Sequence, residues 1–310
     1  MPFAVLTIRT IRHFMKLQRN WGFMLWTKRI WSLMAVGLQE IRDIYQRGMT
    51  DRRDSFPGQI TEREDCVQVK GEEFRVDFKN GLLSGYYLGD CTVIEAPVKP
   101  NFFRATTDND GIWDVDWKAE HVKEWKNALL EEFNFYMTAQ RVRTEQDVVV
   151  VEVVGKALPM SHYIGYDMKF VYRILSDGAV LVEIHGTPYG NMPARLPRIG
   201  VKICLGKGYE EAVWYGRGPR QNYCDSRLAA PVGLYSASIE SLNTLFDVPQ
   251  ECGNYEDTRF LCLKGNKQPG MCVIGCDRFA FSCHNFTQRN LEKARHRNEL
   301  RRTSGNLRTW

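Results

Sequence analysis

A repeated alternation of apolar and polar residues, interrupted by two-residue turns, constrains the fold of this chain more than any other feature. Residues 168–174 alternate up to Asp177-Gly178, and residues 180–184 alternate away from it. Asn80-Gly81 separates two further alternating runs in the same way. A period of two is typical of a strand with one buried face, and Asn-Gly or Asp-Gly favours the tight turn of a hairpin. The pattern therefore predicts antiparallel β-hairpins.

Two more strands and two helices complete this prediction. The runs VVVVEVV at 148–154 and IGVKICLG at 199–206 have strand character. Four apolar residues at helical spacing predict one helix: Val122, Trp125, Leu129 and Phe133. A second short helix is expected at 287–295, with Thr287 as its N-cap. We expect a mainly β protein, a large antiparallel sandwich with one or two short helices.

The segment WYGRGPRQNYCDSR, residues 214–227, has a high density of polar side chains. Gly216 and Gly218 flank Arg217, so we expect a rigid loop and not a strand. Planar donors, acceptors and an aromatic ring within a few residues suit a sugar or a carboxylate partner. The candidate contact residues of this segment are Arg217, Asn222, Tyr223 and Asp225. The alternative interpretation is an ion-paired structural loop.

Two other segments have the same character, VPQECGNYEDTR at 248–259 and PVKPNFFRATTDNDG at 97–111. The prolines and turn residues of the second segment predict an exposed turn outside any central strand. The candidate sugar-binding or docking residues of the two segments are Arg104, Asp108, Asn109, Asp110, Gln250 and Glu251. Asp108 and Asp110 would accept sugar hydroxyls or pair with Arg104, and plain turn carboxylates are the alternative. A glycosidase acid and nucleophile flank one bond at about 5 to 9 Å, which two acids in one turn do not provide.

Five segments resemble, in the same order, signature segments of the small-chain, or fifth, domain of the glycoside hydrolase family 2 beta-galactosidases. They are NFFRATTDNDG, WYGRGPRQNYCDSR, VPQECGNYEDTR, FAFSCHNFTQRNLEKA and residues 296–300. The resemblance extends from residue 62 to residue 300. Phe103 stands where the family has Trp, Thr106 where it has Pro, and Gln221 where it usually has Glu. The last difference weakens any role assigned to Gln221.

The resemblance implies a supersandwich of antiparallel strands, similar to the galactose mutarotase fold, that packs against the catalytic barrel of a beta-galactosidase. Both catalytic glutamates of the family lie on that barrel, so the resemblance implies no catalytic residue in this chain. It implies no cofactor here either, because the magnesium and sodium of the family sit mainly with the barrel. The implied partner is a barrel chain or barrel domains, and the implied substrate of the assembled enzyme is a beta-galactoside. We expect the chain alone to be inactive.

Two other functions are compatible with the same fold. A stand-alone carbohydrate-binding module would bind a galactoside without any barrel partner. A mutarotase-like aldose epimerase needs a histidine and a carboxylate around the sugar ring. His162, His185 and His284 do not sit in a motif that resembles that of a mutarotase.

The two ends of the chain differ from its central body in charge. Residues 1–53 hold ten Lys and Arg against three Asp and Glu, and the last 22 residues hold seven against two. We expect residues 1–60 to be a basic flank, foreign to the domain or poorly ordered, with a helical stripe near 30–45. A membrane-surface helix or a transit peptide is the alternative for this flank. We expect the supersandwich to occupy 61–300 and a truncated tail, without the last strands of the family, to occupy 301–310.

Charge and cysteine content narrow the class of protein. Between the two basic ends the chain has 25 Lys and Arg against 32 Asp and Glu, so the net charge of +5 does not indicate binding of nucleic acid. The longest uncharged run of the flank, residues 30–39, is shorter than the roughly 18 apolar residues of a transmembrane span. Nine cysteines without paired short spacing favour free thiols and a cytoplasmic location. Cys272 and Cys276 lack the second ligand pair that a zinc site needs.

Overall fold

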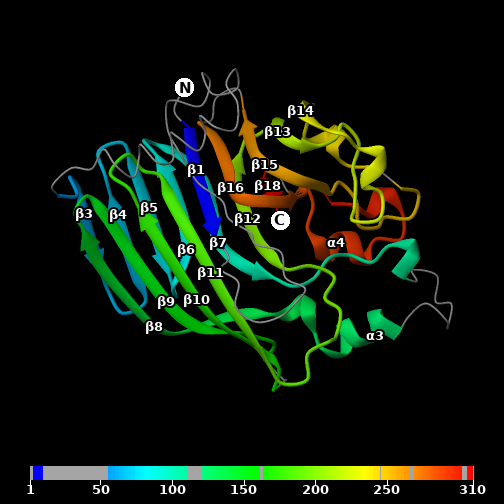
Figure 1. Cartoon of the computed structure of the whole chain (residues 1–310), viewed down its shortest axis with the longest axis horizontal. Coiled ribbons are helices and arrows are strands. Elements are labelled where there is room, and N and C mark those ends of the chain that lie inside the picture. The colour runs from blue at the N-terminus through cyan, green and yellow to red at the C-terminus, as the bar shows by residue number, and fades with distance from the viewer. Residues whose placement is uncertain are drawn as a thin grey trace.

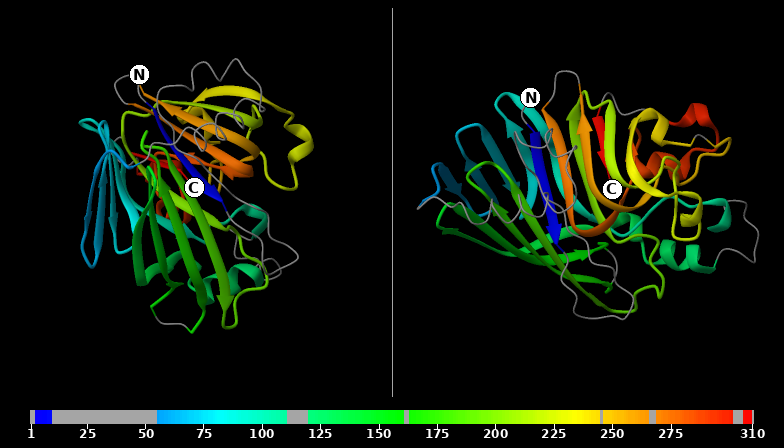
Figure 2. Two further views of the ribbon diagram at one scale, coloured as in Figure 1. Left: turned by 60° about the vertical axis from the view of Figure 1, so that its left-hand side comes forward. Right: turned by 45° about the horizontal axis from the view of Figure 1, so that its top comes forward.

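The computed structural model describes residues 3–9, 55–110, 120–160, 163–244, 246–265, 269–301 and 306–309. Among these residues, two β-sheets of nine and eight strands lie face to face (Figures 1 and 2). The prediction of a mainly β, antiparallel sandwich with few helices is confirmed.

The nine-stranded sheet joins strands from both ends of the described chain. Its order is β14 (Val232–Ser238), β13 (Glu211–Arg217), β15 (Tyr255–Lys264), β16 (Gly270–Phe281), β1 (Phe3–Arg9), β11 (Val180–Tyr189), β10 (Gly165–Ile174), β9 (Val148–Leu158) and β8 (Asn134–Glu145). The pairings of its described strands are antiparallel, except that β1 runs parallel to both β11 and β16. Part of the expected flank therefore forms a strand in the middle of this sheet. The helix expected near residues 30–45 lies outside the described residues, and the separate nature of the flank stays a prediction.

The eight-stranded sheet is antiparallel in every pairing of its described strands. Its order is β17 (Cys283–His284), β18 (Asn306–Thr309), β12 (Gly200–Lys207), β7 (Cys91–Asn101), β6 (Leu82–Leu88), β5 (Phe74–Lys79), β4 (Cys66–Lys70) and β3 (Gln59–Glu62). β18 lies within the expected tail and pairs with β12 and β17, and β3 lies across the expected boundary at residue 60.

The two predicted hairpins form where the turn residues require them. Asn80 and Gly81 have φ values of 49° and 75°, and they join β5 to β6. Gly178 has a φ of 88° between β10 and β11, where Asp177 Oδ1 accepts a hydrogen bond from the Ala179 N–H at 2.9 Å. Glycine adopts positive φ without a steric penalty, and Asn and Asp tolerate it. Both hairpin predictions are confirmed.

The core lies between the two sheets and is rich in aromatic side chains. The largest fully buried side chains are Trp214, Tyr86, Tyr172, Phe78, Phe170, Phe279, Leu83 and Ile94. Phe78 of one sheet meets Tyr172 of the other edge to face, with 4.9 Å between ring centroids. The hydroxyl of Tyr86 donates to the Gly178 carbonyl at 2.9 Å and so avoids the cost of a buried, unpaired donor. These contacts fix one sheet against the other.

One helix is shorter than predicted and the other is confirmed. The first helix, α3 (Glu120–Asn127), ends before Leu129, which has a φ of 50° and begins a 3-10 turn. The apolar stripe therefore does not continue as one helix to Phe133. The second helix is α4 (Gln288–Lys293), and the Thr287 hydroxyl oxygen accepts a hydrogen bond from the Asn290 N–H at 3.0 Å. Thr287 is the predicted N-cap.

The prediction that Pro97 and Pro100 lie outside a central strand is wrong. Both prolines belong to β7, which pairs with β12 and β6. β6 pairs with β7 only as far as Ile94, so the prolines lie where β12 is the sole neighbour that the structure describes. A strand with one free side tolerates the missing N–H of proline.

The prediction of a loop throughout residues 214–227 is wrong at its start. Trp214 to Arg217 belong to β13, which pairs with β14 and β15. Gly216 is needed there for close packing and not for a turn, because a Cβ at this position would lie 2.6 Å from the Thr258 hydroxyl oxygen. The loop itself begins at Gly218.

The expectation of free thiols throughout is wrong for one pair. Cys262 and Cys272 lie directly opposite each other on β15 and β16 and form a disulfide. Strand pairing, and not a short sequence spacing, brings these two residues together. The other seven cysteines are outside this disulfide: Cys66, Cys91, Cys204, Cys224, Cys252, Cys276 and Cys283.

Candidate functional site

The three polar segments meet at one end of the sandwich, beside α3 and α4 on the right of Figure 1. Asp108 and Gln250 form two hydrogen bonds, from the Asp108 N–H to Gln250 Oε1 and from Gln250 Nε2 to Asp108 Oδ2, each 3.0 Å. The Glu251 N–H donates to the Thr106 carbonyl at 3.2 Å. Glu292 on α4 accepts from the Thr106 N–H at 2.7 Å. We call this meeting of segments the loop cluster, and it contains every sequence-predicted site residue.

Asp110 is the buried anchor of the first segment. Arg104 Nη1 donates to its Oδ2 at 2.5 Å, Thr107 donates to the same oxygen through its N–H and its hydroxyl, and His121 Nε2 lies 3.1 Å from Oδ1. Burial alone raises the pKa of Asp110, but Arg104 and Thr107 outweigh this effect and lower the pKa to about 2. The expectation that the turn exposes two carboxylates is wrong: Asp108 is exposed and Asp110 is buried.

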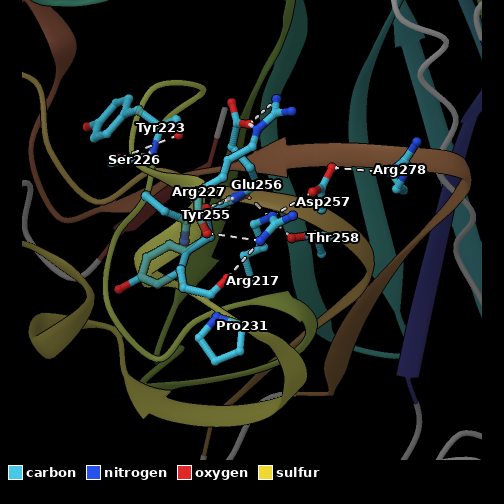
Figure 3. Close-up of polar contacts among 12 residues, drawn as sticks. Arg217, Tyr223, Ser226, Arg227, Pro231, Tyr255, Glu256, Asp257, Thr258 and Arg278 are labelled. Atoms are coloured by element: carbon cyan, nitrogen blue, oxygen red, sulfur yellow. Dashed lines mark hydrogen bonds and ion pairs between the residues drawn. The ribbon is translucent and has the colours of Figure 1, made fainter.

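Arg217 holds the loop that follows β13 (Figure 3). Its Nε donates to Asp257 Oδ2 at 2.6 Å, and its Nη1 donates to the carbonyls of Arg227 and Ala230 at 2.9 Å each. Burial raises the pKa of Asp257, while the hydrogen bond and charge of Arg217 lower it by more, so the net shift is downward. Arg227 pairs with Glu256. The guanidinium groups thus bind this loop to β15.

Asn222 joins the second and third segments from a buried position. Its N–H donates to the Asn254 carbonyl at 2.7 Å, and its Oδ1 accepts from the Glu256 N–H at 3.0 Å. Next to it, Gln221 Oε1 accepts from the Gly253 N–H at 2.6 Å. An acceptor oxygen is all that this contact requires, so Gln221 and the usual Glu of the resembling family serve it equally.

Glu251 is the most deeply buried carboxylate of the loop cluster, with a side-chain exposure of 0%. Its Oε1 accepts from Arg198 Nη2 at 2.6 Å. The hydroxyl of Tyr223 is buried nearby, and burial together with the charge of Glu251 raises the pKa of Tyr223. Asn109 and Asp225, by contrast, are exposed.

The amino-acid sequence matches the family model described as "Beta galactosidase small chain" over residues 68–309. The chain belongs to the beta-galactosidase small chain family. Among its relatives are beta-galactosidases of Vibrio cholerae, 30% identical over 76% of this chain, and of Priestia megaterium, 28% identical over 70%. A beta-galactosidase of Alteromonas mediterranea is 30% identical over 76%. The aligned part covers 22%, 20% and 22% of these proteins in turn, so this small chain spans about a fifth of their length.

The fold brings two further residues into the loop cluster, and neither belongs to a recognisable motif. His121 stands eleven positions after Asp110, at the start of α3, and belongs to no signature segment. Arg198 lies just before β12 and outside every signature segment, so no local pattern marks it. Each of the two residues is identified by its contact with a buried carboxylate, His121 with Asp110 and Arg198 with Glu251.

The described part of the small chain contains no group of three or more His, Cys, Asp or Glu side chains placed to hold a metal ion. None of its described helices is long and apolar enough to span a membrane. His284 is fully buried, and burial, aided by the positive charge of Arg198, lowers its pKa to about 3. His284 is therefore neutral at physiological pH. His162 lies outside the described residues.

Proposed function

We propose that this chain completes a beta-galactosidase, an enzyme that hydrolyses terminal non-reducing beta-D-galactose residues, by docking onto the catalytic barrel. The observation that carries the proposal is the family match over residues 68–309 in a chain that spans about a fifth of its relatives. The barrel would come from another chain or from the remainder of a longer one. In this assembly the small chain supplies structure and contact surface.

The chemistry of the loop cluster supports docking in preference to catalysis. A general acid needs a raised pKa, whereas Arg104 and Thr107 outweigh the effect of burial and lower the pKa of Asp110 to about 2. Asp257 is likewise held ionised by Arg217. Ionised, fully paired carboxylates fix loops and do not transfer protons.

The contacts of Asp110 also weigh against an aldose epimerase. His121 and Asp110 are a histidine and carboxylate pair 3.1 Å apart, but the remaining oxygen of Asp110 is already bound by Arg104 and Thr107. A catalytic base must reach a sugar proton, and this carboxylate has no free acceptor position directed at a ligand. No observation in the loop cluster favours the epimerase or the stand-alone binding module.

An exposed apolar edge lies next to the loop cluster. Leu228 is fully exposed in the loop that Arg217 holds, and Val232 and Leu234 are exposed on β14, which is the last strand of the nine-stranded sheet. A rigid loop that presents an apolar side chain to solvent beside an open strand edge suits a protein partner. We assign docking to this edge together with Asp108, Asn109 and Asp225 of the loop cluster.

A reducing compartment such as the cytoplasm is part of the proposal. Seven of the nine cysteines are outside the disulfide, and the disulfide-bonded pair is fully buried in the sheet.

Sedimentation analysis with the Vibrio cholerae beta-galactosidase, shortened by its matching fifth, tests docking. We expect wild-type chain to associate, Leu228→Asp to associate at least tenfold more weakly, and Ile60→Asp to behave as wild type. Ile60 is a matched control, because it is exposed on β3, and β3 lies at the opposite end of the sandwich in Figure 1. Equal binding by both variants would remove Leu228 from the docking surface, and no association of the wild type would contradict docking itself.

A further inference from the structure

In the described part of the chain the two sheets end in four edge strands, and three of these have features that oppose pairing with another strand. β3 has four residues and β17 has two. β8 carries Arg141 and Arg143, and its register with β9 shifts after Met137. Short length, charge and bulges are means by which proteins keep edge strands unpaired.

β14, the fourth edge strand, has none of these features (Figure 1). Its sequence VGLYSAS contains neither a charged residue nor a proline, and its register with β13 is regular over all 7 residues. The chain carries no charge between Arg227 and Glu240. Val232 and Leu234 are 41% and 51% exposed. An uncharged, regular edge of this kind is a ready template for another strand.

The hydrogen bonds at both ends of β14 show which of its backbone groups face the open side. The Pro231 carbonyl accepts from the Gly218 N–H at 3.2 Å, and the Ile239 N–H donates to the Glu210 carbonyl at 2.9 Å. Backbone groups of an antiparallel strand point to alternate sides from one residue to the next, so the odd-numbered residues of β14 bond to β13. The N–H and C=O groups that point away from β13 are those of Val232, Leu234 and Ser236.

Pairing of β14 with the same strand of a second copy satisfies these groups symmetrically. Two opposed residues of an antiparallel pair exchange both of their backbone bonds when their groups face each other. A two-fold axis at Leu234 opposes this residue to its own copy and opposes Val232 to Ser236. An axis one residue further along would use Ser238, whose carbonyl already accepts from the Ser241 hydroxyl at 2.8 Å. The register centred on Leu234 is therefore favoured.

Charge and apolar surface both suit a second copy of this chain. In the register centred on Leu234, the flanking charges of Arg227 and Glu240 lie opposite uncharged residues, so no like charges meet across the contact. The exposed side chains of Val232 and Leu234 lie on one face, and pairing places them beside the same side chains of the copy. The contact therefore removes apolar surface from water without burying a charge.

We propose that the free small chain forms a symmetric dimer, in which β14 pairs antiparallel with β14 of a second copy around Leu234. This pairing joins the two nine-stranded sheets into one continuous sheet. The dimer concerns the chain without a barrel and does not depend on docking. Because the docking proposed above uses the same edge, the two contacts compete.

Sedimentation of the full chain over a range of concentrations tests the dimer. We expect a monomer–dimer equilibrium whose dissociation constant rises at least about tenfold in Ser236→Pro, because proline removes an N–H from the pairing edge. This N–H points away from β13, so the fold should be retained, which circular dichroism checks. Ser236→Ala keeps the N–H and should match the wild type. A wild-type chain that stays monomeric, or a dimer that Ser236→Pro does not weaken, would overturn the proposal.

Opposite charges at position 234 test the register without a proline. Leu234→Lys and Leu234→Glu should each weaken the dimer, because identical charges then face each other across the two-fold axis. Mixing the two variants should restore the dimer, because opposite charges then face each other. Val154→Lys is the control, since Val154 is exposed on β9, near the other end of the same sheet. A mixture that stays monomeric would contradict the pairing of Leu234 with its own copy.

The shortened Vibrio cholerae enzyme separates this proposal from docking. If the wild-type chain is monomeric and Ser236→Pro weakens its association with that enzyme, the edge takes a strand of the enzyme, and the second copy is excluded. If the wild-type chain forms the dimer and does not associate with the enzyme, the dimer stands while docking fails.

Discussion

Asp108 and Gln250 hold each other through two hydrogen bonds, although they lie 142 positions apart in the chain. The pair joins the turn after β7 to the segment before β15. Since the adjacent Thr106 carbonyl also accepts from the Glu251 N–H, the two segments are bound side by side at three points. The loop cluster is therefore a rigid unit even without a ligand.

Replacing Asp108 by Ala should lower the free energy of unfolding by about 1 kcal/mol, because the Gln250 amide loses its acceptor. Asn109→Ala is the control, since Asn109 is exposed and its replacement should change stability by less than about 0.5 kcal/mol. Urea unfolding of both variants measures the difference. Equal stability of Asp108→Ala and wild type would show that this pair does not hold the segments together.

Replacing Asp110 by Asn should cost about 3 kcal/mol, because it removes the charge that Arg104 pairs with inside the loop cluster. The exposed Asp225→Asn is the matched control and should be neutral. Thermal and urea unfolding check both values. A loss below about 1 kcal/mol for Asp110→Asn would place this ion pair among surface pairs of little energetic weight.

The stability of the wild-type chain should depend on acid through Asp110. Its pKa is lowered from 3.8 to about 2 in the folded protein, so the ionised form stabilises the fold above pH 4, and this contribution is lost as the pH falls toward 2. Unfolding curves recorded from pH 5 to pH 2 should therefore fall less steeply for Asp110→Asn than for wild type. Parallel curves would mean that Asp110 is not held ionised by the fold.

Arg217→Ala and Arg278→Ala form a second matched pair, because both arginines contact Asp257. The Arg217 side chain is 24% exposed and binds at 2.6 Å, so its loss should cost about 2 to 3 kcal/mol. The Arg278 side chain is 59% exposed and lies at 3.6 Å, so its loss should cost under about 1 kcal/mol. The melting temperatures of both variants test this difference in stability. An unchanged melt for Arg217→Ala, with unchanged association with the barrel protein, would exclude a role for Arg217 in folding or docking.

The parts of the fold that follow from local chemistry could be predicted from the sequence. Asn80-Gly81 and Asp177-Gly178 impose turn geometry on their own residues, and Thr287 caps α4 through an N–H three residues away. The signature segments likewise indicated which loops carry the polar groups. These features depend on neighbours within a few positions of the chain.

The parts that depend on distant neighbours could not be predicted in this way. Pro100 is tolerated in β7 because of where β6 stops pairing, and Cys262 meets Cys272 because of the register of β15 and β16. Asp110 is buried by contacts that include His121, and Glu251 is paired with Arg198, which no motif marks. Strand order and long-range pairing decide these features, and a single sequence does not display them.

Hydrolysis of a chromogenic galactoside by a chimaera is the most direct test of the central claim. Residues 68–309 would replace the matching fifth of the Vibrio cholerae beta-galactosidase, with the shortened enzyme and this chain alone as controls. We predict turnover by the chimaera and none by either control, because we propose that this chain completes an enzyme whose catalytic groups lie on the barrel. Turnover by this chain alone, abolished by replacing one of its carboxylates, would contradict that account.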